Sequence, residues 1–540
     1  MDRRVFLEAG GMGALGCFLP GMSRAEGRAG GSAGSIRPEL MAEGRTSGSA
    51  GSPQACAEEK EILGRVEGVV SSGPFSSDWD SLKGYRVPSW YEDSKFGIFI
   101  HWGVYSVPAF MSEWYPREMY FRTNPCFWRH ALKYGPQSKF GYKEFIPMFK
   151  AEKFDPDSWA DLFKRAGARY VVPVAEHHDG FQMYDSKLSE WCAAKMGPRR
   201  DLIGELAFAV RKAGMVFGLS SHRAEHWWFF EGGRRFRSDV REGKWDSLYG
   251  PAQPEKKSRP DKAFMDNWLA RCVELCDKYQ PQLFWFDWWI EQPEFEPYRQ
   301  KFAAYYYNRG AEWNKGVALN YKNQAFPDGA AVLDLERSAL GEIRPLLWQT
   351  DTSVSYISWG YIQNDKFKKP AKLIKELADI VSKNGVLLLN VGPQPDGAIP
   401  EQAQSTLLEI GKWLAVNGEA IYGTRPWKVF GEGPTSLGRN TKYGAGEILA
   451  PELTARDVRF TRKGDTLYAM VMGWPEDGKV EIKSLGKNAG LLDFEIASVR
   501  LLGAGAKIKF ASRDDALIVT LPDEKFSQPA LALAISGPSR

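Results

Sequence analysis

One pattern recurs along much of the 540-residue sequence and restricts the folds open to it. A stretch with helical periodicity ends at Gly or Asn-Gly, a short apolar run follows, and polar residues come directly after that run. The helix expected over residues 155–166 stops at Gly167, and the run 170–175 leads into Glu176-His177-His178-Asp179. Helices that alternate with short buried strands indicate parallel pairing with right-handed crossovers.

Other apolar runs repeat this pattern and place polar residues just past the C-terminal end of a strand, where a (β/α)8-type barrel carries its active site. A doubly wound sheet also alternates helices and strands, but no Gly-x-Gly-x-x-Gly follows any of these runs. The sequence therefore predicts an α/β fold with a (β/α)8-type, TIM-like catalytic barrel over residues 74–430. The further strands are expected at residues 96–100, 215–219, 283–286, 317–319 and 386–389.

The pattern of apolar and polar residues changes after about Gly431. Period-two runs occur at residues 466–471, 479–482 and 516–519, separated by turns such as Asp477-Gly478. Such spacing is typical of an all-β module, so residues 431–540 are expected to form a β-sandwich without a catalytic cluster.

The first residues are typical of an export signal. Arg3-Arg4 precedes Phe6-Leu7, an uncharged Gly/Ala-rich stretch follows, and Ser23-Arg24-Ala25 offers small residues for cleavage. Residues 1–25 thus resemble a twin-arginine signal peptide, and the apolar stretch is too short for a membrane anchor. We expect an exported protein, periplasmic or extracellular.

Residues 26–73 are rich in Gly, Ser and Ala and show little apolar periodicity, so they are expected to form a flexible linker.

Lipid attachment at Cys17 is a weaker interpretation of the N-terminal segment, because Ala14 occupies the position where lipoprotein signals usually have leucine. The other five cysteines include no Cys-x-x-Cys pair, which argues against a disulfide framework or a zinc ribbon.

Charge and composition exclude some functions and leave others open. The net charge of +4 is small for this length and no basic tract occurs, so nothing favours a nucleic-acid partner. Aromatic residues make up 13% of the chain. Flat apolar rings stack on sugars but also fill large cores, so composition alone does not separate carbohydrate binding from packing.

Four of the six histidines, His101, His177, His178 and His222, follow probable strands, which indicates a site. Zinc is the first alternative, through His177-His178 or the pair His222 and His226. However, no His-Glu-x-x-His occurs, adjacent histidines on a turn diverge, and neutral imidazoles also bind hydroxyls. We expect no metal and no organic cofactor.

Asp287 ends an apolar strand and is surrounded in sequence by large aromatic residues. A structural Asp is one reading, but a reactive carboxylate explains the placement better, because an unpartnered buried charge is costly. Glycoside hydrolysis needs a second carboxyl group on the other side of the sugar. The candidates downstream are Asp334, Glu336 and Asp351.

At these residues the chain resembles the alpha-L-fucosidases of glycoside hydrolase family 29, over roughly residues 90–427 and with the motifs in the family's order. The motifs are Trp90-Tyr91, Lys95-Phe96-Gly97-Ile98-Phe99-Ile100-His101-Trp102-Gly103, Glu113-Trp114-Tyr115, His177-His178-Asp179-Gly180-Phe181, Trp285-Phe286-Asp287, Ser358-Trp359-Gly360-Tyr361 and Leu388-Leu389-Asn390-Val391-Gly392-Pro393.

The resemblance implies a retaining exo-glycosidase that hydrolyses terminal alpha-L-fucosyl residues of glycans. By the same resemblance, Asp287 is the nucleophile that forms a covalent fucosyl-enzyme intermediate. Phe99 and Trp359 line a pocket for the C6 methyl group, and an apolar wall there disfavours a 6-hydroxyl. The remaining substrate-binding residues implied by the resemblance are His101, Glu113, Trp114, His177, His178 and Trp285.

The acid/base is inferred from the family's later Trp-Glu motif, which is Trp348-Gln349 here. Stepping back thirteen residues from Gln349 reaches Glu336, which we prefer over Asp351. A salt bridge to Arg337 or Arg344 is the alternative role for Glu336. As an acid it would need a raised pKa, through burial or the neighbouring nucleophile.

Three departures from the family pattern bear on subsite and linkage preference. Ser220-Ser221-His222 replaces Tyr-Tyr-Ser or Tyr-His-Ser, so His222 is expected to take over a polar contact made by tyrosine elsewhere. Gln349 removes a carboxylate, and Lys322 stands where an arginine aligns, which replaces a planar fork by a flexible point charge.

Two other functions remain open at this stage. One is a catalytically silent carbohydrate-binding protein on the same scaffold, against which Asp287 and a suitably spaced Glu336 argue. The other is an exo-glycosidase for a related sugar such as L- or D-galactose, against which the apolar lining argues.

Overall fold

The computed structural model describes residues 52–256, 258–435, 437, 451–504, 508–524 and 528–538. The expected signal peptide, residues 1–25, and residues 26–51 of the expected linker lie outside these ranges. Within them, no helix combines the length and the apolar character needed to cross a membrane.

Eight parallel strands form a closed barrel, in which β1 pairs with both β2 and β8. This confirms the predicted barrel and adds β6 and β7, for which the sequence pattern predicted no strand. The strands are β1 (Phe96–Ile100), β2 (Tyr170–Glu176), β3 (Val216–Ser221), β4 (Leu283–Phe286), β5 (Ala318–Tyr321), β6 (Val332–Asp334), β7 (Trp348–Ser353) and β8 (Gly385–Val391).

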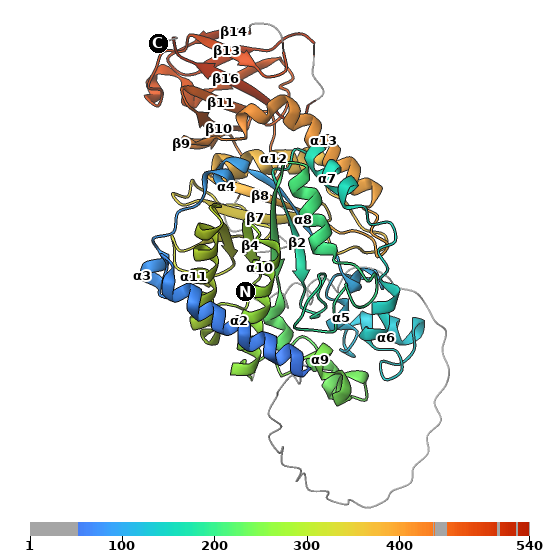
Figure 1. The fold of residues 1–540 in the computed structure, drawn as a ribbon. Coiled ribbons are helices and arrows are strands. Elements are labelled where there is room, and N and C mark those ends of the chain that lie inside the picture. The colour runs from blue at the N-terminus through green and yellow to red at the C-terminus, as the bar shows by residue number, and fades with distance from the viewer. Residues whose placement is uncertain are drawn as a thin grey trace, which may run out of the picture. The chain divides into compact units, whose positions relative to one another are not determined.

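Helices cover the outside of the barrel, as Figure 1 shows for α7, α8, α10 and α11. Asp155 caps α7 by accepting hydrogen bonds from the backbone N–H groups of residues 157 and 158. Gly167, at φ 88°, supplies the left-handed turn after the same helix. The α-helices are α2 (Pro53–Ser72), α3 (Trp79–Leu82), α4 (Ser89–Ser94), α5 (Tyr115–Glu118), α6 (Pro125–Lys133), α7 (Pro156–Arg165), α8 (Leu202–Lys212), α9 (Asp246–Tyr249), α10 (Lys262–Tyr279), α11 (Glu296–Glu312), α12 (Pro370–Ser382) and α13 (Glu401–Asn417).

The structure corrects the linker prediction for residues 53–72, which form α2. Ser52 caps this helix by accepting a hydrogen bond from the backbone N–H of Ala55. Ile62 and Val66, one turn apart, are buried, and the helix packs on α10 and α11. In Figure 1 α2 is the blue helix beside α11. Only Ala55, Ile62 and Val66 are buried in this 20-residue helix, and so few buried apolar residues give too weak a period to recognise in the sequence.

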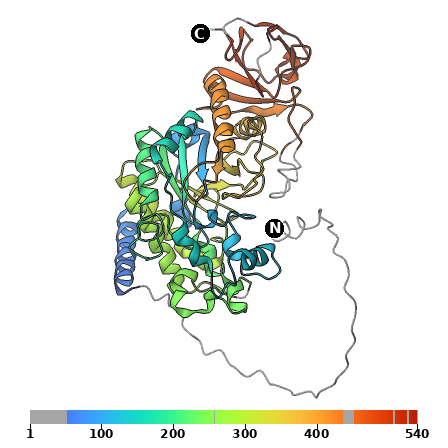
Figure 2. The ribbon, with the colours of Figure 1, turned by 90° about the vertical axis from the view of Figure 1, so that its right-hand side faces the viewer.

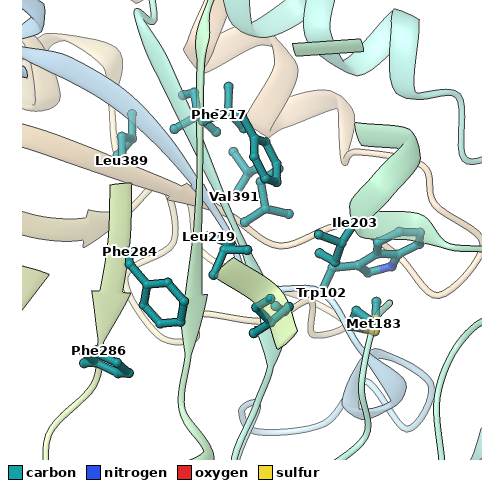
Figure 3. Close-up of a cluster of buried hydrophobic side chains, with 14 of the residues drawn as sticks. Trp102, Met183, Ile203, Phe217, Leu219, Phe284, Phe286, Leu389 and Val391 are labelled. Atoms are coloured by element: carbon teal, nitrogen blue, oxygen red, sulfur yellow. The ribbon is translucent and has the colours of Figure 1, made fainter. Parts of the chain in front are cut away.

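The barrel strands alternate between two apolar cores, and this alternation aims the site residues. Phe284 and Phe286 of β4 belong to the core between strands and helices, whereas Leu283 and Trp285 belong to the cluster inside the barrel. Figure 3 shows the outer core, with Phe284 near its register partner Leu219 of β3 and Phe286 farther along β4. The inward position of Trp285 brings it to the same end of the barrel as the polar residues that follow the strands.

Two antiparallel sheets follow the barrel in sequence and share one apolar core, which confirms the predicted β-sandwich. The C-terminal strands are coloured orange to red in Figure 2. The first strand, β9, begins at Arg425, a few residues before the expected boundary at 431. The sheets contain β13-β16-β11-β10-β9 and β12-β15-β14, with bounds β9 (Arg425–Glu432), β10 (Val458–Lys463), β11 (Thr466–Val471), β12 (Lys479–Ile482), β13 (Ser498–Leu501), β14 (Lys509–Ser512), β15 (Leu517–Thr520) and β16 (Leu531–Ser536).

A buried ion cluster joins the sandwich to the barrel. Asp379 of α12 accepts hydrogen bonds from Arg459 Nε of β10 at 2.6 Å and from Lys383 Nζ at 2.7 Å. All three side chains are at most 1% exposed, and both cations lie over the Phe430 ring of β9. Removing the shared anion would leave two buried cations without their main partner.

We expect Asp379→Asn to lower the free energy of unfolding by about 3 to 5 kcal/mol, because it leaves Arg459 and Lys383 buried with an uncompensated charge. Urea denaturation followed by circular dichroism measures this change. Asp493→Asn is the matched control, since its ion pair with Lys428 is exposed and should leave the midpoint almost unchanged. Equal midpoints for the two variants would contradict a stabilising role for the cluster.

Candidate active site

Polar residues at the C-terminal ends of the strands converge on one end of the barrel. The residues of this group are buried or nearly so, although they come from segments more than 200 residues apart. They follow six successive strands, as expected for a barrel site. They are His101 after β1, His177 and His178 after β2, His222 after β3, Asp287 after β4, Lys322 after β5 and Glu336 after β6.

Asp287 lies at the centre of this group and is 5% exposed. Its Oδ2 accepts a hydrogen bond from His222 Nδ1 at 3.0 Å, and its Oδ1 accepts one from the backbone N–H of Trp288 at 2.9 Å. Lys322 Nζ lies 3.7 Å from Oδ1. Burial alone would raise the pKa of Asp287, but Lys322 and His222 outweigh it and hold the pKa well below its ordinary value. Asp287 is therefore a buried, ionised carboxylate with partners.

His222 contacts this carboxylate directly, which sequence reasoning did not foresee for a residue expected to replace a tyrosine. Its Nε2 lies 2.9 Å from Ser220 Oγ. Burial lowers the pKa of His222 to about 4, so the ring is neutral at neutral pH. The pattern requires a proton on Nδ1, donated to Asp287, and leaves Nε2 to accept from the hydroxyl.

His178 lies on the other side of the same oxygen, with Nε2 3.6 Å from Asp287 Oδ2. Its Nδ1 faces the backbone oxygen of His222 at 2.9 Å and Glu225 Oε2 at 3.2 Å. Burial lowers the pKa of His178, but Glu225 more than compensates, and the pKa is raised overall. Glu225, in the 3-10 segment Arg223–Trp227, was missed by sequence reasoning, although a carboxylate three residues after His222 was the available signal.

Lys322 is the cation of the site. Its Nζ donates to Glu336 Oε2 at 2.8 Å and to Asp351 Oδ2 at 3.2 Å, in addition to its proximity to Asp287. The nitrogen also lies 4.9 Å from the centre of the Trp285 ring. Burial lowers the pKa of Lys322, but these carboxylates outweigh burial and raise it, so the side chain remains an ammonium. The sequence identified Lys322 only as a departure from the family pattern.

The two acid/base candidates differ in access. The Glu336 side chain is 12% exposed and follows β6, whereas Asp351 is 1% exposed within β7. Glu336 forms an ion pair with Lys322, and the same ammonium lies next to Asp287, so Lys322 connects the two carboxyl groups. Arg344, one of its expected salt-bridge partners, pairs with Asp328 instead. The third candidate, Asp334, is buried and accepts a hydrogen bond from the Gln349 side chain.

Apolar rings form one wall of the site. The Phe99 ring lies 4.9 Å from that of Trp285 and 6.4 Å from that of Trp359, measured between centres. Trp359 in turn lies 5.2 Å from His101, and the Arg337 guanidinium lies 4.6 Å above the Trp359 ring. The rings of Phe99 and Trp359, which the resemblance assigns to a pocket for the C6 methyl group, thus lie on one side of the site, with Trp285 next to Phe99.

Hydrogen bonds between loops fix the position of Trp359. Glu113 Oε2 accepts from the Trp359 backbone N–H at 3.0 Å and from Ser358 Oγ at 3.1 Å. Asn390 of β8 donates to the Trp359 backbone oxygen at 2.7 Å, and its own Oδ1 lies 2.8 Å from His101 Nδ1. Asn390 was part of a quoted motif, but its role was not predicted from the sequence.

His177 and Trp114 complete the predicted set. The His177 ring stacks on His222 at 5.1 Å, and the Trp114 ring lies 5.1 Å from His178. The structure therefore gathers all the predicted site residues at one end of the barrel.

Among the described residues, two sets of side chains have the spacing of metal ligands: His101, His177 and His222, and His178, His222 and Asp287. Both sets depend on His222, whose two ring nitrogens already face Asp287 and Ser220. Both ring nitrogens of His222 thus have hydrogen-bonding partners without an ion, so the geometry does not require a metal.

Comparisons with known proteins match both the barrel and the C-terminal sheets to one family of enzymes. The family model described as "Alpha-L-fucosidase" matches residues 63–419, and "Alpha-L-fucosidase C-terminal domain" matches residues 451–536. Tissue alpha-L-fucosidase of Mus musculus is 34% identical over 76% of this chain and 83% of its own length; that of Homo sapiens is 31% identical over 85% and 91%. The crystal structure of Thermotoga maritima alpha-fucosidase with a mechanism-based inhibitor is 31% identical, covers 86% of this chain and all of its own, and superposes with a TM-score of 0.69.

We expect His222 to stay neutral until the pH falls toward 4, well below the ordinary histidine pKa of 6.5. ¹⁵N-histidine NMR should show a neutral ring protonated on Nδ1, and His222→Gln assigns the signal by removing it. Because the folded-state pKa lies below the unfolded one, His222 contributes stability that is present above pH 6.5 and is lost as the pH falls toward 4. A titration midpoint near 6.5 would show that the ring is not buried as described.

Proposed function

Because this chain belongs to the alpha-L-fucosidases of glycoside hydrolase family 29, we propose that it removes terminal alpha-L-fucosyl residues from glycans with net retention, through a covalent fucosyl-enzyme intermediate. The chain is a glycoside hydrolase that acts on fucosyl residues. Retention, the exo mode of action and the individual residue roles are the parts proposed here.

The observation that carries the proposal is the arrangement of Asp287 and Glu336 around one ammonium. Their oxygens lie 3.7 and 2.8 Å from Lys322 Nζ, so they cannot be farther apart than these two distances combined. Retaining glycosidases hold the two carboxyl groups roughly 5 to 5.5 Å apart, and inverting enzymes roughly 6.5 to 9.5 Å. This limit, which applies to one oxygen of each group, places both carboxyl groups within reach of one sugar ring, and membership of the family is the ground on which we propose retention.

In the first step, an Asp287 oxygen bonds to the anomeric carbon while the bond to the glycosidic oxygen breaks, and Glu336 gives its proton to that oxygen. In the second step, Glu336 takes a proton from water, whose oxygen bonds to the anomeric carbon as the bond to Asp287 breaks. Asp287 suits attack because Lys322 and His222 keep it ionised despite burial. Glu336 is the more accessible of the two acid/base candidates.

The ring wall supports fucose as the sugar. A methyl group at C6 gains by contact with Phe99, Trp285 and Trp359, whereas a hydroxyl there would lose hydration. The histidines and Glu113 supply polar atoms for the ring hydroxyls, and Trp114 supplies an indole beside His178. An aryl alpha-L-galactoside differs from the fucoside only by the 6-hydroxyl. We therefore expect it to be a poor substrate, and comparing the two substrates tests the role of the apolar wall.

We expect Asp287→Ala to lower kcat/KM on an aryl alpha-L-fucoside by at least about a thousandfold, because no nucleophile remains. Glu336→Ala should lose less with a good leaving group. Azide should restore its turnover and yield a fucosyl azide of the substrate's anomeric configuration, whereas Asp287→Ala with azide should yield the opposite anomer.

Asp328→Ala, which removes an exposed carboxyl, is the control for these variants. Early NMR spectra of the wild-type reaction should show alpha-L-fucose first. Beta-L-fucose as the first product would rule out retention. Azide rescue of Asp351→Ala but not of Glu336→Ala would move the acid/base role to Asp351.

We further propose that the protein is exported by a twin-arginine signal in residues 1–25, with Arg3-Arg4 as the recognised pair. Cys126, Cys192, Cys272 and Cys276 are buried and free, so folding before export needs no oxidation of these thiols.

Changing Arg3 and Arg4 together to lysine should leave the full-length precursor inside the cell, while the wild-type chain is processed and exported. Cell fractionation with an activity assay measures this. Export of the double variant at the wild-type level would contradict the signal assignment.

A further inference from the structure

Behind Lys322 the structure holds a pair of carboxyl groups that the hydrolytic steps do not use. Asp334 ends β6 and Asp351 lies in the neighbouring strand β7, and both are 1% exposed. The two carboxyl groups contact each other. Within the described residues, Asp334 Oδ1 and Asp351 Oδ1 are buried and receive no hydrogen bond from another donor.

Two carboxylates buried in contact repel each other strongly, and a single proton between them removes the repulsion. A shared proton also provides the hydrogen bond that their two inner oxygens otherwise lack. Burial raises the pKa of both groups; the neighbouring Asp351 raises the pKa of Asp334 further, whereas the hydrogen bond with Asp334 lowers the pKa of Asp351, so the proton of the pair belongs mainly to Asp334.

Gln349 orients the pair. Its Oε1 accepts hydrogen bonds from Tyr91 Oη at 2.7 Å and from Tyr170 Oη at 3.1 Å. The amide nitrogen must then point the other way, and it donates to Asp334 Oδ2. A glutamate at this position would offer no such donor and would add a third acid to the pocket.

The charge left on the pair meets Lys322. Asp351 Oδ2 lies 3.2 Å from Lys322 Nζ, on the buried side of the ammonium, while the more exposed Glu336 contacts the same nitrogen. When Glu336 carries the proton needed for catalysis, it no longer offers an anion to Lys322. Asp351 then remains to hold a flexible side chain next to Asp287.

We propose that Asp351, joined to Asp334 through a shared proton, is a positioning residue that holds the Lys322 ammonium beside the nucleophile throughout the reaction. This role rests on the proposed function. Asp351 acts through Lys322 and touches neither the sugar nor the leaving group. The charged and titratable groups around the pair are Lys322, Glu336, Asp287, Tyr91 and Tyr170.

The test is a double-mutant cycle with Asp351→Asn and Lys322→Gln, assayed on an aryl alpha-L-fucoside. Asp351→Asn should lower kcat by about 10- to 100-fold with a smaller change in KM, because the ammonium is lost from the transition state more than from binding. In the Lys322→Gln background the same change should alter kcat by less than about twofold. Losses that multiply independently in the double variant would overturn the proposal.

Further variants separate positioning from folding. Asp334→Asn supplies an amide donor to Asp351 in place of the shared proton, so its loss of kcat should be at least about fivefold smaller than that of Asp351→Asn. Thermal unfolding is recorded for each variant, and Asp351→Ser, with the same expectation, replaces Asp351→Asn should that variant not fold. Asp328→Asn is the surface control.

The wild-type assay separates this role from the function itself. A wild-type protein that hydrolyses fucosides, together with an Asp351→Asn variant of wild-type kcat, would overturn only the positioning role. A wild-type protein inactive on every fucoside would overturn the function and this role with it.

Discussion

The positive charge of Lys322 decides which carboxyl groups at this end of the barrel are ionised. One ammonium contacts Asp287, Glu336 and Asp351 in a pocket where each charge is costly without a partner. Asp287 receives additional hydrogen bonds from His222 and from the backbone, so it keeps its charge. Behind Lys322, Asp334 accepts from Gln349 and Asp351 accepts from Lys322, but among the described residues one oxygen of each carboxyl group receives no hydrogen bond, and in our proposal a shared proton lies between these two oxygens. An ionised nucleophile and, in our proposal, an acid pair that keeps a single negative charge thus lie around the same cation.

The barrel makes this arrangement possible because its strands deliver one or two polar side chains each to a common end. Strand alternation directs Trp285 and Asn390 inward at that end, while Phe284 and Phe286 pack outward. The loops add Glu113 and Trp359, tied together by hydrogen bonds. The aromatic residues serve both purposes that the composition left open. Trp285 and Trp359 face the site, whereas Trp268 of α10 is buried in the core.

Much of this was predictable from sequence, because apolar runs followed by polar residues mark strand ends whatever the surroundings. The barrel, the sandwich, and the gathering of Asp287 with four histidines follow from that pattern. Strand β7 was not predictable, since its sequence Trp-Gln-Thr-Asp-Thr-Ser is as polar as a loop. Its inward side chains, Gln349 and Asp351, are satisfied by Tyr91 and Lys322 from distant segments, and no local signal records such contacts. The position of Glu225, three residues after His222, could be seen in the sequence, but its contact with His178, 47 residues earlier, could not.

The departures from the family pattern are best understood together. Considered separately, Lys322 replaces the arginine of the family pattern by a side chain with a less fixed geometry, and Gln349 replaces a glutamate by a side chain without a charge. In the structure, Gln349 donates to Asp334, Asp334 shares a proton with Asp351 in our proposal, and Asp351 holds Lys322. A lysine with three rotatable donors needs such an anchor more than a planar guanidinium does. Restoring glutamate at position 349 alone would remove the donor to Asp334 and add charge to a pocket with a single cation. The residue acceptable at each of these positions therefore depends on the other two, and this coupling is a stronger constraint on the site than the identity of any one of them.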